Sequence, residues 1–208
     1  KPMTTTLLAQ EVDAGILDWD SPVVSILPEF AVKDEGLTQR ITVENLVCAC
    51  TGVPRRDFEL LFNANELSAE DIVESLRTFE FFTDFGEAFQ YSNQLVATAG
   101  YVAAAAAGSE WGDLYAGYEA LLQERLLDPL GMARTTLSFD RVVADGNYAM
   151  PYGATLLGYE EIPLSTEYFV TPIAPSGALW STAGEMAEFV REGKMDKMVF
   201  TLFASSAT

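Results

Sequence analysis

The segment FQYSN at residues 89–93 holds the side chains best suited to chemistry, because Tyr91 and Asn93 stand two positions apart there. A phenol donates or accepts a proton, and a side-chain amide holds a carbonyl or an amine by hydrogen bonds. The chain has no histidine, which excludes a serine or cysteine nucleophile activated by an imidazole of this chain. Any nucleophile served by these residues needs lysine, tyrosine, a carboxylate or a metal as its activator. Taken alone, the two residues also fit a packed aromatic side chain and a cap or turn residue.

Composition indicates a globular domain that does not bind nucleic acid or anionic membranes. Of the 208 residues, 49% are hydrophobic, which is enough for one sizeable core. Neither repeats nor low-complexity linkers divide the chain, so residues 1–208 are expected to form a single domain. The net charge of -19 repels nucleic acid and anionic membrane surfaces, which are therefore excluded as partners. Solubility is the simpler explanation of this charge.

No segment reaches the roughly 18 consecutive apolar residues that a membrane-spanning helix needs, and the first residues, KPMT, carry no signal-peptide pattern. The only cysteines, Cys48 and Cys50, stand two positions apart, and we expect this spacing to place them poorly for bridging each other. They are expected to be small core residues. A zinc site of cysteine and histidine is excluded in a histidine-free chain. No metal or cofactor is predicted, and the compartment is left open.

Hydrophobic periodicity predicts helices in the first two thirds of the chain. Residues 92–107 form the longest predicted helix, which Gly108 ends, and Thr42 is an expected N-cap. The other predicted helices span residues 4–14, a short turn after Pro22, 42–47, 68–76, 110–127 and 183–191. Residues 1–131 are therefore expected to be mainly helical, and residues 132–208 to hold loops, short strands and a helix. Together these parts give an α+β class.

Several segments, taken in order, resemble one family. Residues 13–23 (DAGILDWDSPV) with 27–30 (LPEF) resemble its EGKLDLDDPV..YLPEF stretch, and residues 41–53 (ITVENLVCACTGV) resemble its ITV..LLSHTSGL element. Residues 89–93 resemble its Y-x-N element, and residues 174–183 (APSGALWSTA) resemble its PAGGLWSTA turn. In register, these segments are similar to the serine β-lactamase and penicillin-binding-protein-like family. The matching branch contains class C β-lactamases, D,D-peptidases and family VIII esterases.

The resemblance implies a β-lactamase/transpeptidase-like fold. This chain is expected to cover mainly the helical region of that fold, with parts of the antiparallel sheet missing. An S-x-x-K motif with Lys1 as its lysine is also implied, so the nucleophilic serine is expected three positions before Lys1. The family's third motif, K-T-G or H-x-G, is not found in the sequence. The sequence is therefore expected to be truncated at both ends relative to a longer enzyme.

The same resemblance implies a role for each site residue. Lys1 is the expected general base, Tyr91 the proton shuttle and Asn93 the residue that positions substrate and lysine, while Ser176 and Gly177 shape the rim of the substrate site. The implied activity is that of a serine hydrolase that forms an acyl-enzyme on an amide or ester. Its substrate would be a β-lactam, a D-amino-acid peptide or a short-chain ester. The alternative is a catalytically inactive relative that binds a ligand or serves as a scaffold.

Other properties are less determined by the sequence. A small molecule or a peptide is the expected substrate, and the oligomeric state stays open. A periplasmic or secreted location follows from the resemblance only. Three nearby aromatic residues, Phe81, Phe82 and Phe85, indicate a packed loop, with the lining of a substrate cleft as the alternative.

Overall fold

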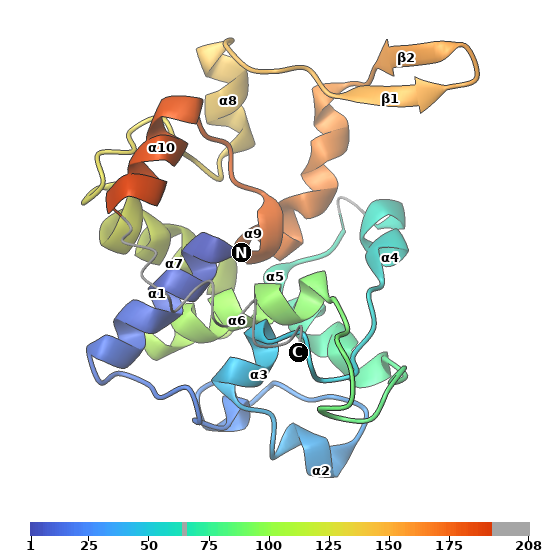
Figure 1. Ribbon diagram of the computed structural model, residues 1–208, viewed down its shortest axis with the longest axis vertical. Coiled ribbons are helices and arrows are strands. Elements are labelled where there is room, and N and C mark those ends of the chain that lie inside the picture. The colour runs from blue at the N-terminus through green and yellow to red at the C-terminus, as the bar shows by residue number, and fades with distance from the viewer. Residues whose placement is uncertain (64–65, 193–208) are drawn as a thin grey trace.

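Helix α6 (Asn93–Ala106) lies at the centre of the computed structural model (Figure 1). Its small, alanine-rich side chains let other helices approach closely, and most of its residues are buried. The Ser92 side chain caps the helix by accepting a hydrogen bond from the Leu95 backbone N–H at 3.4 Å. A helix that is apolar on all sides is expected in the core. Against α6 pack α1 (Pro2–Asp13), α3 (Val43–Val47), α5 (Ala69–Ser75), α7 (Leu114–Leu122) and α9 (Ala174–Gly177).

Several short elements complete the described part of the chain, which is residues 1–63 and 66–192. The further α-helices are α2 (Glu35–Thr38), α4 (Asp57–Phe62), α8 (Phe139–Asp145) and α10 (Ala183–Glu192). The 3₁₀ helices are η1 (Val23–Ser25), η2 (Leu76–Thr78) and η4 (Leu164–Ile173), and the π-helical η3 (Gln123–Leu127) extends α7. Predictions for residues 193–208 fall outside this part.

Helix starts with a strong local signal lie where the sequence predicts them. Thr42 and Ser68 each begin a helix, α3 and α5, through a capping box. Helix α7 begins at Leu114, four residues later than predicted, because Gly112 has a φ of 105° that breaks the helix there. Helices α2, α4, α8 and α9 were not predicted, and residues 174–177 of α9 were expected to form a turn. They are too short for a clear hydrophobic period.

One antiparallel hairpin is the only sheet among the described residues. Strand β1 (Tyr152–Thr155) pairs with β2 (Gly158–Glu161), with Tyr152 opposite Glu161 and Thr155 opposite Gly158. Every residue of β2 is exposed, and the hairpin projects away from the helices (Figure 1). Hairpin side chains therefore add nothing to the helical core, whose members range from Met3 to Phe189.

The prediction about the two cysteines was wrong. Cys48 and Cys50 form a disulfide, with their Cα atoms 5.3 Å apart, a separation within the range that disulfides require. Ala49 between them has a φ of 56°, and this left-handed turn brings the two sulfur atoms together. Both cysteines are only partly buried, so they are not core residues.

The aromatic loop after α5 packs onto the helices. Phe81 and Phe85 contact the hydrophobic core, whereas Phe82 is 72% exposed. The packed-loop interpretation therefore fits Phe81 and Phe85. Within the described ranges, no helix has the length and apolar character needed to cross a membrane.

Candidate active site

The amine of Lys1 is the centre of the candidate site. Lys1 is the N-cap of α1, and its Nζ donates hydrogen bonds to Asn93 Oδ1 at 2.8 Å and to the Ser176 backbone oxygen at 2.6 Å. Nζ also lies 5.1 Å from the centroid of the Tyr91 ring. The structure thus brings together four of the residues that the sequence predicts for the site. They come from the start of α1, the start of α6 and helix α9.

Asn93 connects these groups through both ends of its amide. Its Oδ1 accepts a second hydrogen bond from the Tyr91 hydroxyl at 2.9 Å, and its Nδ2 donates to Asp57 Oδ1 at 2.9 Å. Asp57 also forms an ion pair with Arg55, whose guanidinium carbon lies 5.3 Å from the Tyr91 ring centroid. Asp57 and Arg55 were not predicted as site residues. No spacing or motif separates Asp57 from the other acidic residues among the 31 in the chain.

Ser176 contacts Lys1 through its backbone and not through its hydroxyl. The residue is 3% exposed, and its Oγ donates a hydrogen bond to the Ile173 carbonyl at 2.9 Å. A buried hydroxyl with a partner of its own is not offered to a substrate. Gly177 is exposed and lines the same cavity as Lys1.

Close packing against α6 holds α9 at this position. A Cβ added to Gly100 would lie 2.3 Å from Pro175 Cβ, so only glycine permits this approach of the two helices. From α1, the Thr4 hydroxyl donates to the Pro175 carbonyl at 2.5 Å and shares a 2.9 Å hydrogen bond with the Tyr118 hydroxyl. Burial raises the pKa of Tyr118 to about 12. Its phenol therefore stays neutral and holds the packing without a charge.

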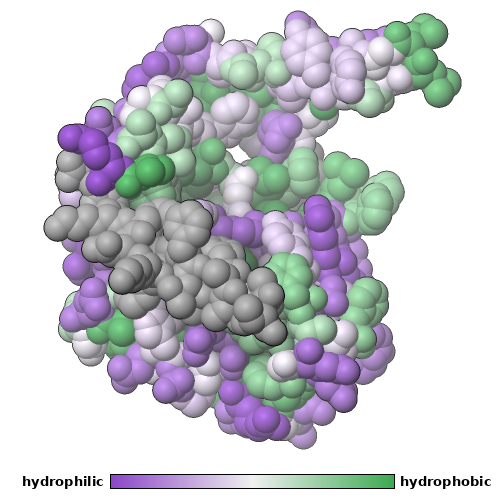
Figure 2. Space-filling view, viewed as in Figure 1, coloured by the Kyte–Doolittle hydropathy of each residue, from purple (hydrophilic) through white to green (hydrophobic). Residues whose placement is uncertain are grey.

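The cavity at Lys1 has a polar end and an apolar side. Its volume is about 650 Å³. Lys1 and Asn93 mark the polar end, and Phe58 of α4 is 76% exposed along the apolar side. The space-filling view shows apolar surface beside the hollow under the projecting hairpin (Figure 2). The apolar lining residues are Phe58, Leu60, Leu61, Phe169, Val170 and Ile173.

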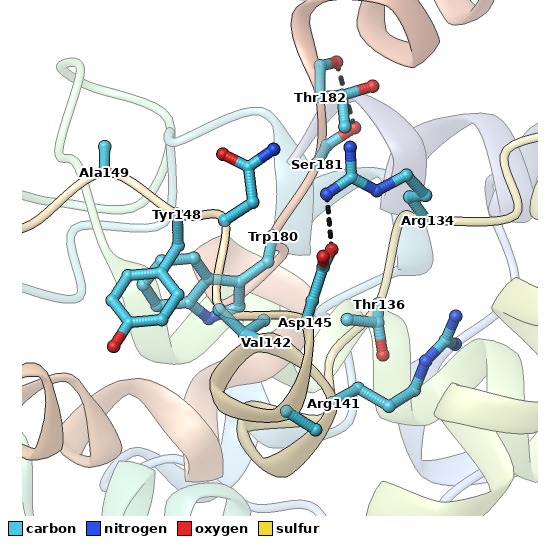
Figure 3. Close-up of a pocket in the computed structure, with 12 residues that line it drawn as sticks. Arg134, Thr136, Arg141, Val142, Asp145, Tyr148, Ala149, Trp180, Ser181 and Thr182 are labelled. Atoms are coloured by element: carbon cyan, nitrogen blue, oxygen red, sulfur yellow. Dashed lines mark hydrogen bonds and ion pairs between the residues drawn. The ribbon is translucent and has the colours of Figure 1, made fainter.

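A second cavity, of about 700 Å³, lies between α8 and the segment before α10 (Figure 3). Its Arg134 forms an ion pair with Asp145, and Arg141 donates a hydrogen bond to the Ala133 carbonyl at 2.7 Å. Trp180 closes one wall. None of the predicted site residues lines this cavity. Although it is slightly larger, its cations are guanidinium groups, which do not act as bases, so we assign the candidate chemistry to the Lys1 cavity.

Helices pack around a buried α6, and a lysine amine and an amide share one cavity, with a phenol hydrogen-bonded to that amide. This arrangement is that of a β-lactamase/transpeptidase-like fold. The comparisons agree: the family model described as Beta-lactamase matches residues 1–204. The chain belongs to the beta-lactamase family. The predicted α+β fold class, with mainly helical content, is thereby confirmed.

Solved structures share this fold. The octameric penicillin-binding protein homologue from Pyrococcus abyssi aligns with a TM-score of 0.73 and 22% identity, over 91% of this chain and 42% of that chain. A D-amino acid amidase from Ochrobactrum anthropi aligns with a TM-score of 0.71 and 21% identity, over 96% of this chain and 57% of that chain. At these identities the similarity shows the fold alone.

Curated relatives are considerably longer than this chain. An unguisins hydrolase from Aspergillus campestris is 28% identical over 199 residues, which are 91% of this chain and 35% of that protein. Beta-lactamase-like protein 2 from Dictyostelium discoideum is 30% identical over 199 residues, which are 91% of this chain and 34% of that protein. The chain therefore spans about a third of the length of these relatives.

Proposed function

We propose that the natural protein containing these residues is a serine hydrolase that forms an acyl-enzyme on an amide or ester. Lys1 acts as general base, Tyr91 as proton shuttle and Asn93 as the residue that positions lysine and substrate. The nucleophile is a serine three positions before Lys1, one helical turn away and on the same face. One observation carries the proposal: the Lys1 amine is held by Asn93 and by the Ser176 carbonyl, beside the Tyr91 ring.

The two hydrogen bonds of Lys1 suit a base. A neutral amine has two N–H groups and one lone pair. If the N–H groups point at Asn93 Oδ1 and at the Ser176 oxygen, the lone pair points in a third direction. A serine hydroxyl lying there within about 3 Å would lose its proton to this lone pair as it attacks.

The proposed reaction forms an acyl-enzyme and then hydrolyses it. The serine oxygen bonds to the carbonyl carbon of the substrate while its proton passes to the Lys1 amine. The carbon–nitrogen or carbon–oxygen bond breaks, the leaving group takes the proton of the Tyr91 hydroxyl, and the proton held by Lys1 replaces it on Tyr91. The Tyr91 hydroxyl and Lys1 hydrogen-bond the same Asn93 oxygen. Water then attacks the carbonyl carbon of the acyl-enzyme ester and gives one proton to the Lys1 amine. The ester carbon–oxygen bond breaks, and the serine oxygen takes that proton from Lys1 as the acid is released. These steps use side chains and water only.

The cavity and the relatives support acyl transfer to water. The apolar side that includes Phe58 and Phe169 offers a surface for an apolar part of the substrate, next to the amine. The family match and a relative named as an unguisins hydrolase support a hydrolytic reaction. We also propose that residues 1–208 belong to one domain, because a single core includes both Met3 and Phe189.

Covalent labelling tests the proposal. The natural protein would be treated with a fluorescent penicillin and with a fluorophosphonate probe, and turnover of nitrocefin and of p-nitrophenyl esters would be followed. We expect labelling by at least one probe and turnover of at least one substrate. Binding of these compounds without a covalent adduct or turnover would support the inactive ligand-binding alternative instead.

A further inference from the structure

We propose that Asp57 is a positioning residue that fixes the orientation of the Asn93 amide, so that its oxygen and not its N–H faces Lys1. This inference rests on the proposed function, because it assigns Asp57 a role in activating the lysine. It is carried by the hydrogen bond from Asn93 Nδ2 to Asp57 Oδ1 at 2.9 Å.

The Asn93 amide has two ends of nearly equal shape but opposite hydrogen-bonding character. Its oxygen accepts from the Lys1 amine at 2.8 Å and from the Tyr91 hydroxyl at 2.9 Å, while its nitrogen donates to Asp57. One oxygen therefore accepts hydrogen bonds from both Lys1 and Tyr91. An ionised carboxylate only accepts hydrogen bonds, so Asp57 pairs with the nitrogen end alone.

Without Asp57, a second orientation becomes available. With the amide turned over, an Asn93 N–H would point at the Lys1 amine. A neutral amine would accept that hydrogen bond with its lone pair, which is the group that must take the proton of the serine. Asp57 therefore keeps the Asn93 N–H groups away from this lone pair. The resulting role is exerted through Asn93, without contact between Asp57 and the reacting atoms.

Two further contacts hold Asp57 and offset its charge. Arg55 forms an ion pair with Asp57. A lone carboxylate would favour the charged form of a neighbouring amine, and the positive charge of Arg55 opposes this effect. The buried Gln94 of α6 donates to the Arg56 carbonyl at 3.1 Å. This second bond ties the residues just before α4 to the helix that carries Asn93. The carboxylate is thus fixed relative to the amide that it orients.

A double-mutant cycle on the natural protein tests the inference. The second-order rate constant of fluorophosphonate labelling would be measured for the wild type, Asp57→Ala, Asn93→Ala and the double variant. We expect Asp57→Ala to slow labelling by roughly 10- to 100-fold, as a small misplacement of a catalytic group does. In the Asn93→Ala background the same change should alter the rate by less than about 2-fold, because no amide is left to orient. Equal slowing in both backgrounds, or wild-type labelling by Asp57→Ala, would overturn the inference.

Glu59→Ala is the matched control. Glu59 also lies in the first turn of α4 and forms an ion pair with a neighbouring arginine, Arg56, but it does not line the Lys1 cavity. Its removal should leave labelling unchanged.

If Asp57→Ala does not fold, Asp57→Asn is used in its place. The asparagine side chain keeps an accepting oxygen, but its amide can adopt either of two orientations and so fixes Asn93 less firmly. This variant should be slowed about 3- to 10-fold, again only when Asn93 is present. A wild-type protein that is not labelled at all would instead contradict the proposed function.

Discussion

The Lys1 cavity and the Arg134 cavity both carry cationic side chains, but they differ in whether these cations can act as a base. At the Lys1 cavity, a lysine amine is held by two acceptors. At the Arg134 cavity, the cations are guanidinium groups, which pair with Asp145 and the Ala133 carbonyl. A guanidinium keeps its proton under all ordinary conditions, whereas an amine can release one and act as a base. The type of cation and its partners, and not the cavity volume, therefore make the Lys1 cavity the candidate for catalysis.

Replacing the amine should have the largest effect. Lys1→Met keeps the apolar stem but removes the base, so we expect kcat/KM for the substrate that the natural protein turns over to fall by about 10³-fold. Lys33→Met is the control, because Lys33 pairs with Glu80 on the surface. Steady-state kinetics of the two variants measure this difference. Retention of activity by Lys1→Met would show that the Lys1 amine is not the base.

Loss of the amide that holds the lysine should have the next largest effect. Asn93→Ala removes the oxygen shared by Lys1 and Tyr91, and we expect kcat to fall by about 10²-fold. The matched change in the other cavity is Asn147→Ala, since Asn147 is an exposed residue that lines the Arg134 cavity. That variant should keep wild-type kinetics. Equal losses in the two variants would mean that the cavities are not functionally different.

A smaller effect should come from the packing that places α9. In Gly100→Ala the new methyl group overlaps Pro175, so we expect unfolding to require about 1–3 kcal/mol less free energy. Activity should fall as the Ser176 carbonyl moves away from Lys1. Gly184→Ala in α10 is the control, because a Cβ added to Gly184 would lie 3.9 Å from its nearest neighbour, the Thr182 hydroxyl oxygen. Thermal unfolding followed by circular dichroism measures the stability of the two variants. A Gly100→Ala variant as stable as the wild type would show that α9 is not held by this contact.

The Arg134 cavity should give the smallest effect of all. Arg134→Ala breaks an ion pair whose two side chains are 46% and 45% exposed. Solvent screens such exposed pairs, and they contribute little to stability, so the unfolding midpoint should stay close to that of the wild type. Turnover and probe labelling should not change. A tenfold loss of activity in this variant would reverse the assignment of the two cavities.

Local signals predicted most of the helices but only part of the site. The caps at Thr42 and Ser68 depend on residues three positions apart, so the sequence alone was enough to find them. The contact between Lys1 and Asn93 joins residues 92 positions apart, and only the family resemblance indicated it. Spacing alone has no information about such long-range contacts, because they depend on how the helices pack.

Two misses have the same physical origin. The hydrogen bond from Asn93 to Asp57 depends on where the short helix α4 packs, and no periodic pattern predicted that helix. The Cys48–Cys50 disulfide depends on the left-handed backbone at Ala49, which a non-glycine residue rarely adopts. In each case one backbone feature that the sequence does not indicate decides which side chains meet.

The position of a covalent adduct tests the central claim most directly. The natural protein would be labelled with the fluorophosphonate probe, digested, and analysed by mass spectrometry. We predict a single adduct on a serine three positions before Lys1, in the peptide that contains Lys1, and loss of that adduct in Lys1→Met. An adduct on any other residue, or undiminished labelling of Lys1→Met, would contradict the assignment of Lys1 as the base.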